Sequence, residues 1–401
     1  MNNKGGKSIS LIAGMLVLLF ATTPGIATDT WECKILPSEN RVTIDPVSNA
    51  KIVFITSHES DDTNLYFHDR SWLFNDRLVI FNSNRFGNTE IFGYVLKTGE
   101  LVRLDEPGKS PAHSPLAASC GDVIYVVRGS AIFQWKLTLA EGNGTKLSVT
   151  EKKICDFPPG SKQFSGLNEN ANGSLISFGY ILDDNYIIAI ADVNTGTVQK
   201  VTQPQLPAQH IQFHWTRPDL IAFASSYGND TAPLEPANPP HARINFVNTN
   251  TRLPLIAFYQ APGELVTHEC WWVNDQITFI GGHRPGEGHV KVMDLKSGEI
   301  RIIGAGAWWA DASESELAKV NWWHAAGSRN GKWIAADNWH GIVAVFDAQN
   351  TQMRILTQGH RIYGGGAHPH VGWDLNSKKV VFTSNKFGNA DVCIGYIPKD
   401  W

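Results

Sequence analysis

The feature that most constrains the fold is a turn-and-strand motif that recurs roughly every 50 residues. Each copy is a tight turn followed at once by an apolar strand rich in β-branched residues. The seven copies are "NDRLVIF" at 75, "GDVIYVV" at 121, "NGSLISF" at 172, "PDLIAFA" at 218, "NDQITFI" at 274, "NGKWIAA" at 330 and "NSKKVVF" at 376.

A second hairpin follows several of these copies, as in residues 83–104 and 384–398. Seven units of four strands each predict an all-β chain folded as a seven-bladed β-propeller. A pair of β-sandwiches is the alternative, but the even spacing argues against a boundary between two domains. We therefore expect one propeller domain over residues 28–401, in which "KIVFITS" (51–57) completes the last blade or opens the first.

Composition fits a globular protein with a sizeable core, since 42% of the 401 residues are hydrophobic and 18% are charged. A net charge of -4 gives no sign of a nucleic-acid partner. The 14 tryptophans are many for this length. Exposed aromatic rings are common where sugars stack, although Trp is also a normal core residue of β-rich folds.

The first 27 residues read as a signal peptide, with a basic start, an apolar run and small residues before "TDT". Cleavage after Ala27 predicts a secreted or periplasmic protein, and an uncleaved anchor is the alternative. No other segment is apolar enough to cross a membrane. Export permits disulfides, and Cys33 with Cys393 is an attractive pair because the two ends of a closed propeller usually meet in one blade.

Histidines gather just before the recurring turns, where the innermost strand of each blade is expected. All of them lie an even number of residues before their turn, so an unbroken strand would place them on one face. We interpret the set as a functional ring lining the central channel. Its members are His113, His210, His214, His268, Cys270, His324, His368 and His370.

Two segments of this set place metal-ligand side chains two residues apart. "ELVTHECWW" carries His268 and Cys270, and "GGGAHPHVGW" carries His368 and His370. One thiolate and three imidazoles arranged as a tetrahedron favour Zn²⁺. His324, on the blade between them, is a rival ligand or a partner of the ligands. A polar channel without a metal is the alternative.

Four stretches of the chain resemble the seven-bladed propeller polysaccharide lyases, which include the oligogalacturonide lyases and the ulvan lyases. They are "TSHESDDTNLYFHDRSW" near the start, "THECWW", "WWHAAGSRNGKWIAAD" and "HPHVGWDLNSKKVVFTS". The resemblance runs from about residue 50 to the C-terminus and is strongest over the last three blades. It implies an acidic polysaccharide as substrate.

The resemblance leaves the metal open between two branches of the group. Oligogalacturonide lyases hold Mn²⁺ with a His like His268, the two His of the HPH motif, and a Gln at the position that Gly365 occupies here. A zinc site of one Cys and three His is associated with ulvan lyases, and Cys270 matches it. The resemblance thus favours Zn²⁺, with Mn²⁺ or Ca²⁺ as alternatives. Together with the export signal it favours ulvan as the substrate.

Such lyases cleave by β-elimination, which needs neutralisation of the C5 carboxylate, a base for the C5 proton and an acid for the leaving O4. The resemblance implies a His, a Tyr and an Arg. Tyr227 and Arg243 match the last two, with proton transfer assigned to Tyr227 and carboxylate neutralisation to Arg243. His210 and His113 are the candidates for base or charge-stabilising roles, and which takes which role stays open. Arg217 and His214 compete with these assignments.

Three functions remain compatible with the sequence. The first is a secreted, monomeric lyase acting on ulvan or a related uronate polymer, and the second is an exported oligogalacturonide lyase. The third is a non-catalytic propeller whose channel histidines hold a structural metal. A glycosidase is disfavoured, because no two carboxylates can be assigned to one site.

Overall fold

The computed structural model describes residues 28–142, 144–227, 230–235, 238–361 and 363–401. The predicted signal peptide lies outside these residues. Among the helices of the described chain, none is long and apolar enough to cross a membrane.

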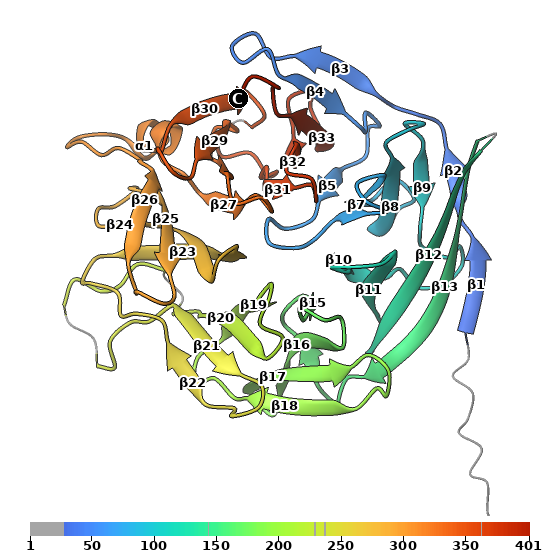
Figure 1. Ribbon diagram of the computed structural model, residues 1–401, viewed down its shortest axis with the longest axis horizontal. Coiled ribbons are helices and arrows are strands. Elements are labelled where there is room, and N and C mark those ends of the chain that lie inside the picture. The colour runs from blue at the N-terminus through green and yellow to red at the C-terminus, as the bar shows by residue number, and fades with distance from the viewer. Residues whose placement is uncertain (1–27, 143, 228–229, 236–237, 362) are drawn as a thin grey trace, which may run out of the picture.

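Seven antiparallel sheets stand in a ring around a central axis, which confirms the predicted seven-bladed β-propeller (Figure 1). We number these sheets as blades one to seven in chain order. Blade one contains β5 (Asp62–Asn64), β6 (Trp72–Leu73), β7 (Leu78–Ser83), β8 (Glu90–Val95) and β9 (Leu101–Arg103). Blade two contains β10 (His113–Ala117), β11 (Val123–Arg128), β12 (Ala131–Gly142) and β13 (Gly144–Asp156). Blade three contains β14 (Lys162–Gln163), β15 (Asn168–Glu169), β16 (Leu175–Leu182), β17 (Asn185–Asp192) and β18 (Val198–Thr202).

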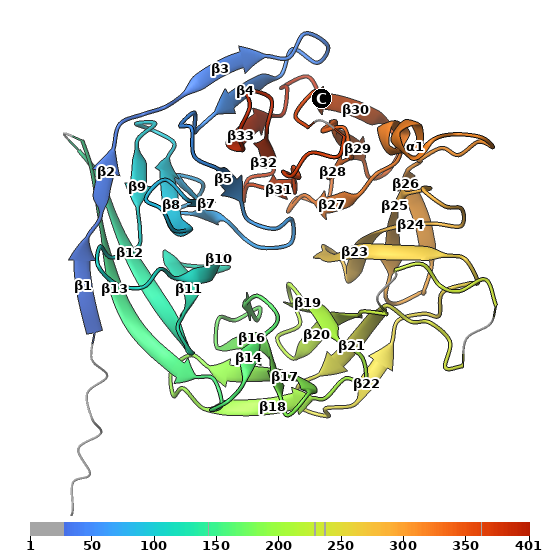
Figure 2. The same cartoon turned by 180° about the vertical axis from the view of Figure 1, so that it is seen from behind.

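The remaining blades follow the same order around the ring, seen from the other side in Figure 2. Blade four contains β19 (Ala208–Phe213), β20 (Leu220–Ser225), β21 (Ile244–Asn248) and β22 (Pro254–Ile256). Blade five contains β23 (Leu265–Trp272), β24 (Gln276–Gly282), β25 (His289–Asp294) and β26 (Ile300–Gly304). The short helix α1 (Glu314–Val320) then leads to blade six, with β27 (His324–Gly327), β28 (Trp333–Asp337), β29 (Val343–Asp347) and β30 (Met353–Thr357). Blade seven contains β31 (Gly372–Trp373), β32 (Lys379–Ser384) and β33 (Asp391–Tyr396).

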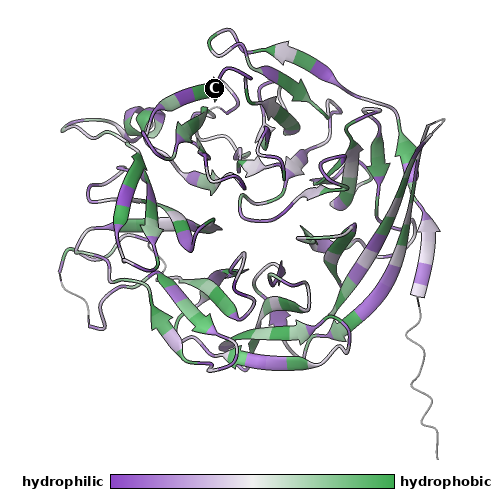
Figure 3. Cartoon of the chain, viewed as in Figure 1, coloured by the Kyte–Doolittle hydropathy of each residue, from purple (hydrophilic) through white to green (hydrophobic). Residues whose placement is uncertain are grey.

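The core lies between the blades, where seven apolar clusters each join one blade to the next. Strand β7 shows how one strand serves two interfaces. Its Leu78 and Ile80 pack toward blade two, while Val79 and Phe81 pack toward blade seven. Because successive side chains of a strand point to opposite faces, a strand between two blades must be apolar on both faces. This explains why the recurring motifs are continuous apolar runs. Figure 3 shows hydrophobic stretches in green along strands of the blades.

The N-terminal strands close the ring and cover its edge. Strand β4 (Lys51–Phe54) pairs with β33, so "KIVFITS" completes the last blade, and β3 (Arg41–Ile44) extends that sheet. Strands β1 (Thr28–Glu32) and β2 (Lys34–Leu36) pair with the outer strands of blades two and one. They occupy backbone groups that an exposed edge strand would leave unpaired.

The expected Cys33–Cys393 disulfide is absent, and all five cysteines are free. Cys33 lies between β1 and β2 on the outer edge, whereas Cys393 lies inside β33 and is fully buried. The chain ends do meet in one blade as expected. The chain ends are joined by the pairing of β4 with β33. Cys33 lies outside that blade, between two strands that pair with blades two and one.

The innermost strands of blades two, four and five each contain a β-bulge at the same place. The ladder skips two residues after His113, Gln209 and Thr267 and resumes at Leu116, Gln212 and Cys270. The first skipped residue has a left-handed backbone in each case, with φ of 53° at Ser114, 48° at His210 and 53° at His268. A bulge adds one residue to one strand and re-aims the side chains around it.

Candidate metal centre and active site

The centre of the ring is occupied by a segment of blade one. The innermost strand of that blade is interrupted between β5 and β6, which both pair with β7. The intervening residues, 65–71, reach toward the axis (Figure 1). They carry Tyr66, whose ring centroid lies 5.3 Å from that of His210 and 4.8 Å from that of His370. Side chains from opposite parts of the ring therefore meet around one tyrosine.

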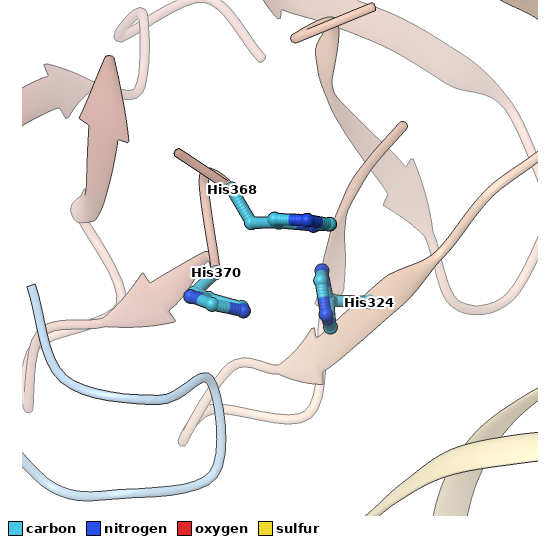
Figure 4. Close-up of side chains that lie close together, drawn as sticks. All are labelled: His324, His368 and His370. Carbon is cyan, nitrogen blue, oxygen red and sulfur yellow. The ribbon is translucent and has the colours of Figure 1, made fainter. Parts of the chain in front are cut away.

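Three imidazoles converge beside Tyr66 (Figure 4). His324 opens β27, and His368 and His370 precede β31. One nitrogen of each lies within 4.8 Å of a nitrogen of both others. The ring centroid of His324 is 4.4 Å from that of His370 and 5.7 Å from that of His368. We call these residues the three-histidine group.

A buried carboxylate orients one member of the group. His324 stands opposite Asp337 in the pairing of β27 with β28, and its Nδ1 lies 2.9 Å from Asp337 Oδ1. Both side chains are almost completely buried. When Nδ1–H donates to the carboxylate, Nε2 carries the free lone pair, which is the arrangement common for histidines that bind metals.

The donor set of the group fits a divalent transition metal. Three imidazoles with an oriented tautomer are the ligands that zinc and its neighbours prefer, and a site with three protein ligands keeps a position for water or substrate. Burial lowers the pKa of all three imidazoles, and that of His370 falls to about 3. The rings are therefore neutral at neutral pH and able to coordinate a cation.

Two of the four predicted ligands, His368 and His370, belong to this group, and His324 takes part as the third member. His268 packs against it, with its ring centroid 4.4 Å from that of His324. It is not among the residues whose nitrogens all lie within 4.8 Å of one another. Its Nδ1 instead lies 3.1 Å from Thr267 Oγ1.

Cys270 does not join the group. The alternation assumed for residues 268 and 270 is broken by the bulge. Thr267 pairs with Ile280 and Cys270 with Thr278, so Cys270 lies on the same face of the sheet as Thr267 and not on that of His268. Its Sγ lies 3.4 Å from the Trp271 carbonyl oxygen. Burial raises the pKa of the thiol well above its usual value, which keeps the sulfur protonated and unlike a metal-binding thiolate.

A chain of charged groups reaches Tyr66 through His210. His210 Nδ1 lies 2.6 Å from Glu269 Oε1, and Arg243 Nε donates to Glu269 Oε2 at 2.8 Å. The Arg243 guanidinium also donates to Asp230. Glu269 is fully buried, and only 3% of Arg243 is exposed. His210 and Arg243 thus meet through a carboxylate that the sequence analysis did not single out.

The electrostatics of this chain hold Glu269 ionised. Burial alone would raise its pKa, but Arg243 and His210 outweigh burial and hold the pKa below the usual range of a carboxyl. For His210, burial lowers the pKa and Glu269 opposes that shift. With Nδ1–H donated to Glu269, Nε2 of His210 is an unprotonated base at neutral pH.

Arg243 is fully engaged by acidic partners. Burial would lower its pKa, whereas Glu269 and Asp230 raise it, so it stays charged. Two carboxylates already neutralise the guanidinium, so the structure places it as a support for Glu269.

The other two predicted catalytic residues lie away from the central rings. His113 is exposed, and its Nδ1 lies 3.2 Å from the hydroxyl of Ser114. The ring of Tyr227 stacks on His241 with centroids 3.8 Å apart, and its hydroxyl accepts a hydrogen bond from the Ala242 backbone N–H. His214 is also structural in character, since its Nδ1 accepts from two backbone N–H groups of the following turn.

Sequence reasoning missed four residues of the central site: Tyr66, His68, Glu269 and Asp337. His68 belongs to the inserted segment, and its buried Nε2 has no hydrogen-bond partner among the described residues. Its ring centroid lies 5.1 Å from that of His210. The stretch "TNLYFHDRSW" was part of the family resemblance, and its three adjacent aromatic rings were the available signal. Glu269 stands between His268 and Cys270, and a strict two-residue alternation placed it on the wrong face.

Comparison with solved structures gives the class of fold. An oligogalacturonate lyase from Vibrio parahaemolyticus matches with a TM-score of 0.73 at 14% identity, over 92% of this chain and 99% of that chain. An oligogalacturonate lyase in complex with manganese matches with the same score and identity, over 92% of this chain and 98% of that one. A prolyl endopeptidase matches with a TM-score of 0.54 at 12% identity, over 84% of this chain and 46% of that one.

At these identities the likeness shows the fold alone, which is that of a seven-bladed propeller. No protein family matches the sequence, and no curated protein does. In this propeller, imidazoles from blades four to seven converge around Tyr66.

Proposed function

We propose that this protein is a metal-dependent polysaccharide lyase that cleaves a uronate-containing glycan by β-elimination. One observation carries the proposal: an open three-histidine group and an unprotonated His210 face the same tyrosine. The likeness of the whole chain to oligogalacturonate lyases, one of them with manganese, supports the same class of reaction.

The charge needed at the uronate carboxylate is assigned to the three-histidine group. His324, His368 and His370 would hold a divalent cation, which would supply positive charge at that carboxylate and so make the C5 proton easier to remove. This differs from the role first assigned to Arg243, whose guanidinium is buried between Glu269 and Asp230. Zinc is the metal that three imidazoles favour, and manganese is the alternative that the solved lyase suggests.

Proton transfer is assigned to His210 and Tyr66. His210, oriented by Glu269, takes the C5 proton through Nε2. Tyr66 gives its hydroxyl proton to the leaving O4. Burial and the nearby Glu269 raise the pKa of Tyr66, so the phenol holds its proton until the leaving oxygen accepts it. Tyr66 thus takes the proton-transfer role that the sequence alone assigned to Tyr227.

The substrate is the finer part of the proposal. Ulvan remains the preferred prediction, because Gly365 stands where oligogalacturonide lyases carry a metal-binding Gln, and because residues 1–27 are predicted to be an export signal. An exported oligogalacturonate lyase is the second candidate, favoured by the structural likeness.

The test is an activity screen of the purified protein on ulvan, oligogalacturonides, alginate and glycosaminoglycans. The growth of ultraviolet absorbance from the unsaturated product is the readout. Activity should disappear with a chelator, return with zinc or manganese, and be absent from His368→Ala. Absence of unsaturated product from every glycan, with metal bound and the fold intact, would favour the non-catalytic propeller instead.

A further inference from the structure

A large cleft opens beside the three-histidine group. Its volume is about 910 Å³, which lies within the range of ligand pockets. Its walls come from blades four, five and six and from the connection that contains α1. Nothing in the proposed β-elimination uses this cleft, so its lining must be explained separately.

Aromatic rings form much of the wall. Trp308, Trp309, Trp323, Trp339 and Tyr363 all line the cleft, and none of them is fully buried. Trp309 is 43% exposed and Tyr363 is 37% exposed. Aromatic faces left open to solvent in a cleft are the surfaces on which the C–H faces of sugar rings stack.

Trp339 connects this wall to the metal centre. Its ring centroid lies 4.5 Å from that of His368, and the Arg361 guanidinium lies 4.5 Å from the same indole ring. The ring of Trp323 lies 4.9 Å from that of His268. A glycan chain whose uronate reaches the three-histidine group would therefore continue along the tryptophans.

The charge of the cleft restricts which sugars fit. Its described lining contains four carboxylates and no lysine or arginine. Asp230 is paired with Arg243, and Glu287 lies 3.3 Å from His289. Asp311 and Glu314 are exposed, and neither forms an ion pair within the described chain. Two guanidinium groups stack on wall residues without lining the cleft themselves: Arg284 lies 4.6 Å from the Trp308 ring and Arg361 lies 4.5 Å from the Trp339 ring.

We infer that the aromatic cleft binds uncharged sugar units next to the cleaved uronate, so that the substrate is a mixed glycan and not a homopolymer of uronates. A second or third uronate placed on Trp308 and Trp309 would bring its carboxylate toward Asp311 and Glu314, and like charges repel. The position of the uronate rests on the proposed function, but binding in the cleft does not require turnover.

The experiment measures binding by isothermal titration calorimetry with the metal-loaded, full-length protein. The probes are neutral hexasaccharides of β-linked glucose, xylose and mannose, with hexagalacturonate for comparison. We expect at least one neutral hexasaccharide to bind and Trp309→Ala to weaken it about three- to tenfold. Phe86→Ala is the matched control, because Phe86 is 40% exposed on blade one, and it should leave binding unchanged.

A second variant tests the role of charge. The double substitution Asp311→Asn with Glu314→Gln should strengthen hexagalacturonate binding severalfold at low salt, and the gain should fade at high salt because exposed charges are screened. The inference is overturned if no neutral hexasaccharide binds, if Trp309→Ala leaves binding unchanged, or if hexagalacturonate binds the unaltered protein more tightly than every neutral probe.

These outcomes separate the cleft from the chemistry. Lyase activity on homogalacturonan that is unaffected by Trp309→Ala would keep the proposed function and remove the inference. Neutral-sugar binding that depends on Trp309, in a protein that cleaves no uronate glycan, would keep the cleft and remove the lyase.

Discussion

Blades two and four have nearly the same innermost strand, yet only blade four contributes to the site. In both, the ladder breaks at the same place, and the pairing aligns His113 with Gln209 and Ser114 with His210. The residue with the left-handed backbone reaches the central rings in blade four, while the residue before it is exposed in both. The scaffold thus offers an equivalent position in these two blades, and the side chain at that position decides whether the blade takes part.

The sharpest test of this comparison removes the two histidines one at a time. His210→Ala should lower kcat about 100- to 10,000-fold, because it removes a general base. His113→Ala should leave kcat within about threefold, since its side chain is exposed and is hydrogen-bonded to the neighbouring Ser114. Steady-state kinetics on the best substrate would measure both. Equal losses in the two variants would show that the bulge does not distinguish the blades.

The next largest effect is expected on stability, at Glu269, which supports His210. Glu269→Gln leaves Arg243 buried without its main partner, and breaking a buried ion pair costs about 3–5 kcal/mol of unfolding free energy. Urea denaturation followed by tryptophan fluorescence would measure the loss. Glu299→Gln, at an exposed position, is the control and should stay within about 0.5 kcal/mol. A wild-type-like midpoint for Glu269→Gln would contradict the ion-pair chain described here.

The metal side of the site depends on the orientation of His324. Asp337→Asn keeps the size of the side chain but weakens the acceptor for His324 Nδ1, so metal affinity should fall about tenfold. Competition with a chelator would measure it, with exposed Asp400→Asn as the control. Unchanged metal affinity would mean that His324 is not a ligand and would favour His268, which the sequence predicted, as the third ligand.

The smallest effect is expected at Cys270. Cys270→Ala removes one buried atom and should cost about 1 kcal/mol of stability. The metal content measured by mass spectrometry should stay the same, because the bulge turns Cys270 away from the three-histidine group. Loss of the metal in this variant would restore the ligand set that the sequence alone indicated.

Much of the fold was predictable because its determinants are local. Each recurring turn is encoded by a few residues such as "NG" and "ND", and each apolar run by the need to bury both faces of a strand between two blades. The seven strands that follow these turns begin within three residues of them. For residues 51–57 the sequence left two places open, the last blade or the first, and the pairing of β4 with β33 decides for the last.

The candidate site was predictable only in part, and the failures share one cause. The histidines of the HPH motif were identified from their spacing, and His324 was recognised as a rival ligand. Cys270 and His113 were placed with the central histidines, and Glu269 was overlooked, because the two-residue alternation of a strand was assumed to continue through a bulge. The extra residue reverses the side on which every later side chain lies.

The amino-acid sequence by itself determined the number of blades, the closure of the ring and the supply of imidazoles near its axis, because turns and apolar runs act between neighbours in the chain. Only the tertiary structure decided which of those imidazoles meet. That outcome depends on single-residue bulges in three strands and on the insertion of Tyr66 from blade one. The contacts of Tyr66 with His210 and His370 join residues that lie far apart in the chain, and such contacts are not encoded in the pattern of neighbouring residues.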